Sequence, residues 1–373
     1  MGNAVYVTFM PIYLNSIGLT KTAIATLLSL GPLMAILAQP VWGSIGDRSK
    51  SKNNVLLILL LGSAVSVLLF PLSNEYLYLL TIICVVAFFQ TSIYPLSDAI
   101  TLEYLAKTEW QFGPIRLAGT VGFAIMSVAF GFYAKEQINS IFIVYFLVMM
   151  LAVVVCFRLP KIKGHQSNGQ KKSMWVIFKN RKLVLFMLFS FIIQCTLGYY
   201  YTFFPIYYSE MGADNSLLGW AMFLSALSEI PFLLFADKII NRFGIPKVLL
   251  STAFFAGVRW LLLYLVDNPY IVLPIQMFHG VIFIVLMVTI AMYINKEVPK
   301  ELKASGQTMY GLISMGIARI VGSILGGVTS DHIGMAEVFL YNSIIAFLTL
   351  IIFIYIFARE ANNNIQPLHT NTN

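Results

Sequence analysis

Long hydrophobic stretches, separated by short polar segments, run along almost the whole chain. A helix needs about 20 apolar residues to cross the roughly 30 Å hydrocarbon core of a bilayer, and runs of about that length recur here. Twelve spans are predicted, over residues 2–17, 21–45, 54–72, 76–104, 113–134, 139–158, 183–208, 215–236, 247–266, 270–295, 304–330 and 336–358. The pattern therefore predicts an all-α membrane protein with twelve transmembrane helices.

The composition agrees with this pattern. Hydrophobic residues make up 59% of the sequence and charged residues 11%, and the mean hydropathy is +0.82, whereas a soluble protein has about 25% charged residues. A soluble fold is excluded, and the lipid bilayer is the expected surrounding. The net charge of +8 does not indicate nucleic-acid binding, because the basic residues are spread over several loops rather than gathered in one patch.

The distribution of basic residues predicts the orientation in the membrane. When the loops are assigned alternately to the two sides, one side receives 20 of the 24 Lys and Arg, the other receives 2 (Lys21 and Lys135), and 2 lie within spans (Arg259 and Arg319). Such an excess marks the cytoplasmic side. We therefore expect a multi-pass protein of the plasma membrane with both termini in the cytoplasm.

One long polar segment divides the twelve spans six and six. The expected organisation is an N-terminal six-helix half over residues 1–158, a cytoplasmic linker over 159–182, a C-terminal six-helix half over 183–358 and a cytoplasmic tail over 359–373.

An internal repeat relates the two halves at an offset of 194 residues. Phe-Met-Pro-Ile-Tyr at 9–13 matches Phe-Phe-Pro-Ile-Tyr at 203–207, and Gly18 matches Gly212. The halves are thus predicted to be parallel repeats, an arrangement in which a binding site lies between them near mid-membrane.

The first span is shorter than its repeat. Pro205 lies 22 residues after Leu183, where the seventh span begins, but Pro11 lies only 10 residues after Met1. The first helix thus lacks about 12 residues at its cytoplasmic end, and a span of about 15 residues reaches roughly 23 Å. We expect that helix 1 is truncated at its N-terminus, either because the native start lies upstream or because the sequence is incomplete there.

Six charged or titratable residues lie inside the hydrophobic stretches. A charge at the middle of a bilayer costs at least about 2.5–3.5 kcal/mol, so these positions are candidate functional residues. Acids, bases and an imidazole are all present, which favours ion pairing and proton relay over a pore lined by one sign of charge. The six residues are Asp98, Arg116, Glu229, Arg259, His279 and Arg319.

Two of these residues are expected to pair in the first half. Asp98 on the fourth span and Arg116 at the start of the fifth fall at similar depth, and each would be costly alone. The alternative is a purely structural salt bridge, or an Arg116 side chain that extends to the interface.

The second half carries a three-residue cluster. Glu229, Arg259 and His279 lie on spans 8, 9 and 10, within about two helical turns of the same depth. A carboxyl group beside a guanidinium and an imidazole has a proton affinity that changes with conformation, as a proton-coupled carrier requires. The alternative is a static network that fixes helix packing. Arg319 either joins this cluster or binds a substrate anion.

A charged motif lies at the end of the second span, and a similar segment occupies the equivalent position in the second half. Gly43 begins the segment Gly-Ser-Ile-Gly-Asp-Arg, which ends at Asp47 and Arg48; Asn241 and Arg242 occupy the equivalent positions of the repeat. We expect these residues in cytoplasmic loops that gate the site. The alternative is a plain basic loop on the cytoplasmic side.

These features resemble the major facilitator superfamily, and within it the lactose permease-like group, most closely its phenylpropionate and nucleoside permeases. The resemblance is carried by Pro95-Leu96-Ser97-Asp98, by Phe112-Gly113-x-x-Arg116-Leu117-x-Gly119-x-x-Gly122-Phe123, by Glu229, by residues 240–244 and 258–260, and by His279. It implies the major facilitator fold.

The resemblance also implies roles for individual residues. In the lactose permease, the residues matching Asp98 and Arg116 bind sugar, and the aromatic residue matching Phe123 stacks on it. The residues matching Glu229, Arg259 and His279 serve substrate binding and proton coupling there.

This sequence departs from the lactose permease at two positions near the histidine. Ile282 stands where the permease has a carboxylate, and Gln276 stands where it has a lysine. Glu229 is therefore the expected proton carrier. Phe123 replaces a stacking tryptophan, which argues against a disaccharide.

The expected function is proton-coupled symport that imports a small organic solute, such as a sugar, a nucleoside or an aromatic carboxylate. The alternative is proton-driven efflux of hydrophobic compounds, in which Asp98 would serve as the acid; a remote alternative is a transport-dead sensor or a polytopic enzyme. No metal-ligand spacing, nucleophile motif or phosphate loop is found in the sequence, so no enzyme activity, cofactor or metal is expected. Nothing in the sequence indicates an oligomer, and a monomer is expected.

Overall fold

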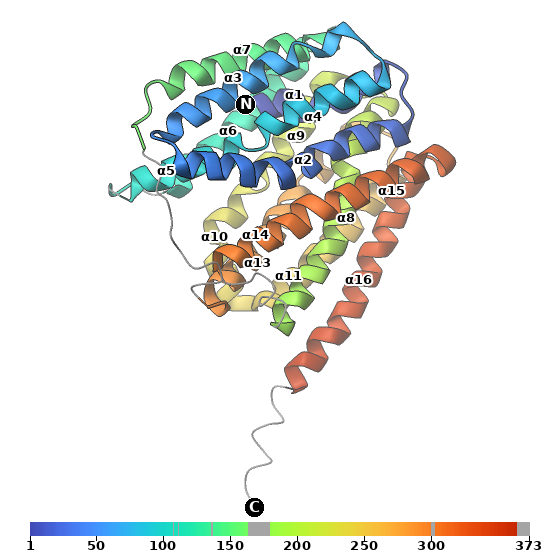
Figure 1. The fold of residues 1–373 in the computed structure, drawn as a ribbon. Helices are drawn as coiled ribbons and strands as arrows, with labels where there is room; N and C mark the ends of the chain where they lie inside the picture. Colours follow the sequence, from blue (N-terminus) through green and yellow to red (C-terminus); the bar gives the residue numbers. More distant parts are fainter. Residues whose placement is uncertain (107, 111, 136, 163–179, 300–302, 364–373) are drawn as a thin grey trace, which may run out of the picture.

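The computed structural model describes residues 1–106, 108–110, 112–135, 137–162, 180–299 and 303–363, and shows a bundle of helices (Figure 1). No strand occurs in the part of the chain that is described. The first half contains α1 (Gly2–Ser16), α2 (Lys21–Arg48), α3 (Lys52–Val67), η1 (Phe70–Leu72), α4 (Tyr76–Gln90), α5 (Ile93–Leu105), α6 (Phe112–Tyr133), η2 (Ile138–Ser140) and α7 (Ile141–Cys156). The second half contains α8 (Arg181–Glu210), α9 (Asn215–Leu227), α10 (Ile230–Phe243), α11 (Ile245–Leu265), α12 (Pro269–Ile275), α13 (Phe278–Glu297), α14 (Lys303–Gly311), η5 (Leu312–Ile317), α15 (Ala318–Ile333) and α16 (Met335–Asn363).

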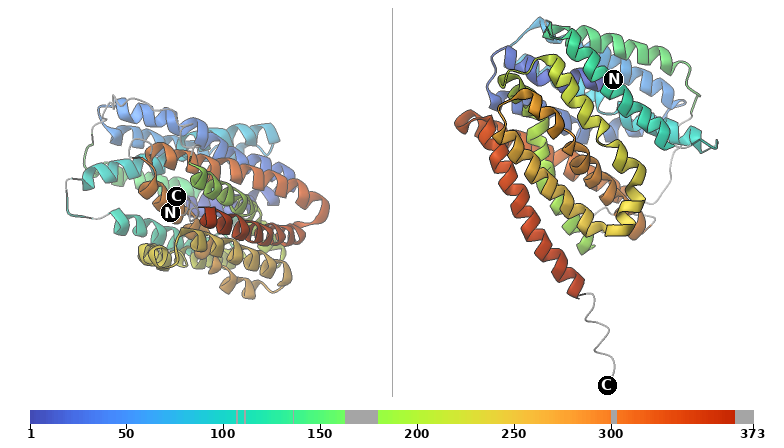
Figure 2. Two further views of the ribbon diagram at one scale, coloured as in Figure 1. Left: turned by 90° about the horizontal axis from the view of Figure 1, so that it is seen from below. Right: turned by 180° about the vertical axis from the view of Figure 1, so that it is seen from behind.

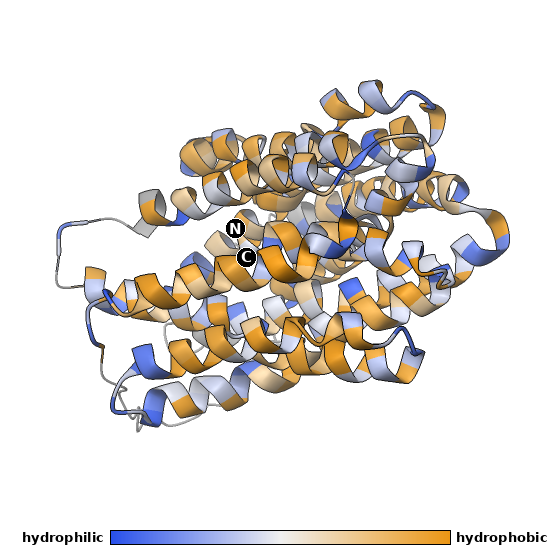
Figure 3. Ribbon diagram, turned by 90° about the horizontal axis from the view of Figure 1, so that it is seen from above, coloured by the Kyte–Doolittle hydropathy of each residue, from blue (hydrophilic) through white to orange (hydrophobic). Residues whose placement is uncertain are grey.

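The predicted all-α fold class is confirmed. Eleven helical stretches of the described chain are long and apolar enough to cross a membrane. The predicted first span is the 15-residue helix α1, whereas its counterpart in the repeat, α8, has 30 residues. Leu37, Leu234 and Ile351 are among the large apolar side chains that lie exposed on the outside of the bundle, as expected for lipid-facing positions, and the helices are apolar over most of their length (Figure 3).

The repeat is visible in the backbone as well as in the sequence. Gly18 follows α1 with φ of 84°, and its counterpart Gly212 follows α8 with φ of 90°. Only glycine adopts this left-handed conformation readily, so the same turn ends the same helix in both halves.

Three predicted boundaries differ from the structure. The Gly43–Arg48 segment, expected in a loop, forms the last turns of α2, which ends at Arg48; the backbone becomes extended at Ser49. Asn241 and Arg242 likewise lie in the last turn of α10. Glycine lowers helix stability by only about 1 kcal/mol, so the two glycines of the motif do not end α2. At the C-terminus, α16 continues to Asn363, so the predicted tail begins as helix, and residues 163–179 of the predicted linker lie outside the described residues.

Several spans are broken near their middle, and prolines account for two of the breaks. Pro95 has no N–H for the carbonyl of Thr91, which lies between α4 and α5 and accepts a hydrogen bond from Gln39 instead. Pro231 similarly follows the break between α9 and α10. A third break, at Gln276, separates α12 from α13.

The breaks in α9/α10 and α12/α13 touch each other. The Gly280 N–H donates to Ser228 Oγ at 2.8 Å, and a Cβ at Gly280 would lie 2.1 Å from the Ser228 carbonyl oxygen. This close contact between backbones places Glu229 and His279 side by side.

Contacts between the halves gather at one end of the bundle, opposite the end where α7 leads toward α8. We call these the far end and the linker end. At the far end, Lys21 Nζ lies 2.8 Å from Glu210 Oε1. The Asp331 carboxylate accepts the backbone N–H groups of Lys21 and Thr22 at 2.9 and 2.8 Å. An acid of the second half thus caps the N-terminus of α2.

A second contact at the far end joins α6 to α9. A Cβ at Gly131 would lie 2.5 Å from the Asn215 carbonyl oxygen, and one at Gly219 would lie 2.4 Å from the Ser127 carbonyl oxygen. The two backbones therefore meet directly where these helices cross.

An ion pair lies beside this crossing, between Lys135 Nζ and Asp214 Oδ2 at 3.0 Å. Hydrogen bonds from Ser216 and from the Leu217 backbone N–H, together with Lys135, lower the pKa of Asp214 to about 2, so this acid is ionised at neutral pH.

The helices of the two halves diverge toward the linker end (Figure 1). The same spreading is seen from behind in Figure 2, where α16 runs along the outer edge of the second half. The two halves are thus joined at the far end, and their helices lie further apart at the linker end.

Candidate functional site

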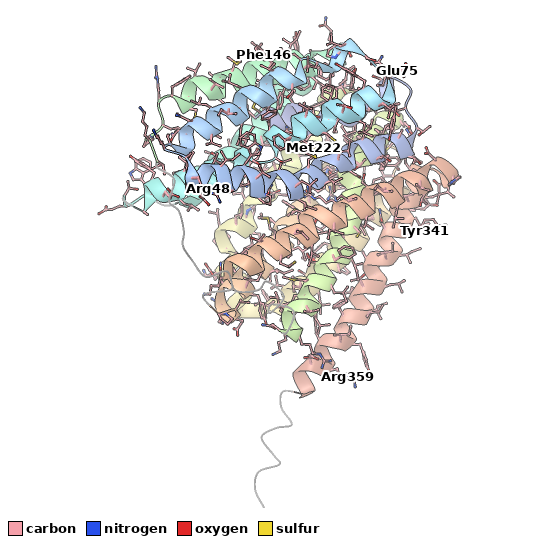
Figure 4. The ribbon with its side chains drawn as sticks, viewed as in Figure 1. Arg48, Glu75, Phe146, Met222, Tyr341 and Arg359 are labelled. Atoms are coloured by element: carbon pink, nitrogen blue, oxygen red, sulfur yellow. The ribbon has the colours of Figure 1, made fainter. Side chains whose placement is uncertain are left out.

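A cavity of about 370 Å³ lies between the two halves, within the roughly 300–1,000 Å³ of typical small-molecule sites. We call it the central cavity. Met222, labelled in Figure 4, lines it from α9. The predicted site residues that line it are Arg116, Phe123, Glu229, His279 and Arg319.

Two larger cavities, of about 700 and 610 Å³, are lined by residues of the second half alone. Neither contains any of the six charged or titratable residues predicted inside the spans. Of the three cavities, only the central cavity is therefore lined by both halves and by these charges.

Arg259 does not reach the central cavity but lies directly behind it, fully buried on α11. Its Nη2 donates to Gln276 Oε1 at 2.5 Å and its Nη1 lies 3.0 Å from His279 Nδ1. The guanidinium carbon is 4.2 Å from the ring centroid of Tyr200. No described carboxylate pairs with Arg259, so amide oxygen, imidazole nitrogen and aromatic faces stabilise its charge.

These contacts fix the protonation of His279. Every N–H of a guanidinium is a donor, so Nδ1 must accept the bond from Arg259 and the ring proton must be on Nε2. From Nε2, that proton faces the Tyr201 hydroxyl at 3.0 Å and Glu229 Oε1 at 3.8 Å. His279 is thus held neutral in one tautomer while the Arg259 bond lasts.

Glu229 stands at the break between α9 and α10, with its side chain 16% exposed. It is the only acid among the described residues that line the central cavity. Its position, beside a neutral imidazole and open to the cavity, allows it to exchange a proton with the cavity.

Asp98 and Arg116 form the expected ion pair, with Oδ2 and Nη1 3.6 Å apart. Their side chains are 38% and 53% exposed, and Arg116 also lies over the ring of Tyr94 at 5.6 Å. A pair this exposed contributes little to stability, so Arg116 can exchange this partner for a ligand at small cost. Asp98 itself does not line the central cavity.

Arg319 lines the cavity from α15. Its guanidinium lies 4.4 Å from the ring centroid of Tyr201 and 5.7 Å from that of Phe283. A Cβ at Gly198 on α8 would lie 2.8 Å from the backbone of Arg319, so the glycine permits this close position. Arg319 and Arg259 both flank the pair formed by Tyr201 and His279.

The predicted gating residues lie apart from the central cavity. Asp47 Oδ1 is 3.7 Å from Lys52 Nζ, which also bonds Glu103, so this end of α2 is tied to its own half. Arg242 lies over its neighbour Phe243 at 5.4 Å.

The sequence did not mark several residues that the structure brings to the site. Gln276 accepts hydrogen bonds from Arg259, from Tyr200 at 2.7 Å and from Ser225 at 3.2 Å through one oxygen. Asn3 lines the cavity and accepts a bond from Gln90 at 3.1 Å. In the sequence, the one indication that Gln276 belongs to the site is its position one helical turn before His279.

A helical bundle in two halves with a charged cavity between them is the arrangement of a secondary transporter. The chain belongs to the MFS_1 like family, whose profile matches residues 4–341. It is a transporter of the major facilitator kind, not an enzyme, and an integral multi-pass membrane protein.

Its relatives include proteins of known and unknown cargo. The uncharacterized transporter YwbF of Bacillus subtilis is 25% identical, covering 93% of this chain and 87% of that protein. The maltose permease of Geobacillus stearothermophilus is also 25% identical, covering 92% and 87%. The crystal structure of a point mutant of the nucleoside transporter NupG matches with a TM-score of 0.86 at 18% identity, covering 95% of this chain and 96% of that one. This last likeness shows the shared fold.

Proposed function

We propose that this transporter is a proton-coupled symporter that imports a small organic solute, such as a sugar, a nucleoside or an aromatic carboxylate, by alternating access. The observation that carries the proposal is the place of Glu229, an acid of the central cavity whose oxygen lies 3.8 Å from a neutral imidazole.

Protonation of Glu229 changes the charge of the cavity without changing its shape. Binding of solute and binding of a proton are therefore coupled whenever the solute interacts differently with the two forms. The Arg259 bond keeps His279 neutral, which leaves Glu229 as the group that gains and loses the proton.

If the linker end is cytoplasmic, as the basic residues predict, the conformation is the inward-facing state of an alternating-access cycle. The central cavity then opens inward and the far end is the closed outer gate. Rocking of the halves would close the linker end and separate Lys21 from Glu210 and Asp331.

Efflux by antiport has less support from the site. Asp98, the acid expected to serve it, is paired with Arg116 and does not line the central cavity.

The experiment is uptake into proteoliposomes with an imposed pH gradient. Glu229→Gln is expected to abolish accumulation of solute against its gradient while exchange of solute across the membrane continues, because the neutral amide binds no proton. Glu75→Gln is the matched control: Glu75 is an exposed acid at the start of α4, far from the cavity (Figure 4). Undiminished accumulation by Glu229→Gln would exclude Glu229 as the proton carrier.

A further inference from the structure

Arg319 is a cation of the central cavity that has no acid partner in the described part of the chain. Among the described residues, no carboxylate lies within ion-pair distance of it, and Glu229, the one acid that lines the cavity, contacts His279 instead. The Nε of Arg319 is also buried without a hydrogen-bond partner. A charge in the middle of a membrane protein is costly unless it is paired, so this group is poised for a ligand.

The fold holds Arg319 in this position. The π-helical turn η5 ends two residues before it, at Ile317. Such turns are frequent at functional sites, and the missing side chain of Gly198 admits the Arg319 backbone. Tyr201 and Phe283 flank its guanidinium at 4.4 and 5.7 Å. These aromatic rings favour the cation but do not neutralise its charge.

The charges around the cavity do not balance. Arg116, Arg259 and Arg319 are positive, whereas Asp98 and Glu229 are negative when ionised. One net positive charge remains with Glu229 ionised, and a second appears when Glu229 is protonated. A site with this charge attracts an anion, and more strongly in its protonated form.

We propose that the transported solute is a small organic monoanion whose carboxylate pairs with Arg319. A guanidinium matches a carboxylate with two parallel hydrogen bonds. The remainder of the solute would lie against the aromatic walls of the cavity, which Phe123, Tyr201 and Phe283 supply. This inference rests on the proposed symport and narrows its cargo to one chemical class.

The pairing also explains how proton and solute would be coupled. An ionised Glu229 repels a carboxylate in the same cavity, and a protonated Glu229 does not, so each ligand favours the other. One proton and one monoanion then cross together, and no net charge moves. Transport should respond to a pH gradient but not to a membrane potential, whereas a neutral solute with one proton would respond to both.

The test uses purified wild-type protein in liposomes and a panel of matched probes. The probes are 3-phenylpropionate and its primary amide, glucuronate and its primary amide, maltose and uridine. Uptake is measured with a pH gradient alone and with a potassium–valinomycin potential alone, and the signal of protein-free liposomes is subtracted. Thermal stabilisation of the detergent-purified protein by each probe reports binding independently of transport.

The variants are Arg319→Gln, Arg319→Lys and, as the matched control, Arg158→Gln. Arg158 is an exposed arginine just after α7, outside the cavity. We expect at least one acid, but not its amide, to bind and to be taken up under the pH gradient alone. Arg319→Gln should weaken this binding by about tenfold to a hundredfold, as for loss of a hydrogen-bonded charge. Arg319→Lys should retain part of it, and Arg158→Gln all of it.

Three results would overturn the inference: potential-driven uptake of maltose or uridine, acid binding that Arg319→Gln leaves unchanged, or no binding of any acid. Failure of the symport proposal looks different, because an acid would then still bind through Arg319 but the pH gradient would drive no uptake.

Discussion

At the scale of single residues, the site combines charged side chains, which the hydrophobic pattern of the sequence identifies, with uncharged polar side chains, which it does not. Glu229, Arg259, His279 and Arg319 were predicted because a charge interrupts an apolar stretch, and the structure brings them together around Tyr201 or behind it. Gln276 was not predicted, because an uncharged amide hardly alters a hydrophobic pattern. Yet its oxygen accepts three hydrogen bonds and orients Arg259.

The fixed tautomer of His279 gives a prediction about its role. In His279→Gln, the amide oxygen can accept from Arg259 and the amide N–H can donate to Tyr201, so the network keeps its form without a titratable group. We expect the rate of uptake to fall by up to about tenfold, while solute still accumulates under a pH gradient.

The measurement is the steady-state accumulation ratio at a fixed pH difference, with Glu229→Gln as the comparison that loses accumulation. If His279→Gln kept exchange but lost accumulation, the histidine would be a proton carrier after all.

At the scale of elements, the breaks in the spans position the chemistry. Spans 8 and 10 were predicted as continuous, although Pro231 lies within the first and Pro274 within the second. The breaks were hard to predict because they depend on contacts between helices that are distant in sequence, such as that of Ser228 with Gly280. The end of α2 was misplaced for a related reason: charged residues indicate the membrane boundary, but a helix continues into water until a capping residue ends it.

The contact between these breaks makes Gly280→Ala destabilising. The added methyl group would meet the Ser228 carbonyl oxygen at 2.1 Å, and since that atom belongs to the backbone, two helix breaks must shift. We expect the free energy of unfolding to fall by about 1–3 kcal/mol, together with transport.

Thermal unfolding of the purified protein measures this effect. Gly31→Ala is the control, because Gly31 lies within α2 with nothing within 4 Å of an added Cβ, and alanine there should leave the protein equally or slightly more stable. Equal melting temperatures for the two variants would contradict the close contact.

At the scale of the whole molecule, the repeat made the fold predictable but not its conformation. Matching segments such as 9–13 and 203–207 indicate two similar halves with a site between them. Which end of the molecule is open depends on a small difference in free energy between two conformations, in which the same surfaces make different contacts. Asp331 is one of the residues that hold the far end closed. It lies near the end of a helix, where charged residues are common, so the sequence did not single it out.

Asp331→Asn should therefore shift the molecule toward opening at the far end. The amide cannot accept two backbone N–H groups of α2 as the carboxylate does, and it loses the attraction to the positive end of that helix. We expect a cysteine in the cavity, introduced as Thr120→Cys, to react several-fold faster with an impermeant maleimide from the far side.

The labelling is done with Cys84, Cys156 and Cys195 replaced by serine. Asp267→Asn is the control, because Asp267 is an exposed acid between α11 and α12 at the same end of the bundle. If both variants react at the wild-type rate, Asp331 does not hold the halves together.

The way the far end is closed has a consequence for how fast the transporter can work. Its contacts are ion pairs and a helix cap near water, around a crossing where two backbones meet with almost no side chains between them. Such a crossing can pivot with little repacking, and dissolved ions screen exposed charges over about 8 Å at physiological ionic strength. Salt on the side of the membrane that the far end faces should therefore speed turnover without altering how tightly the cargo binds, which would make the medium on that side a regulator of this carrier.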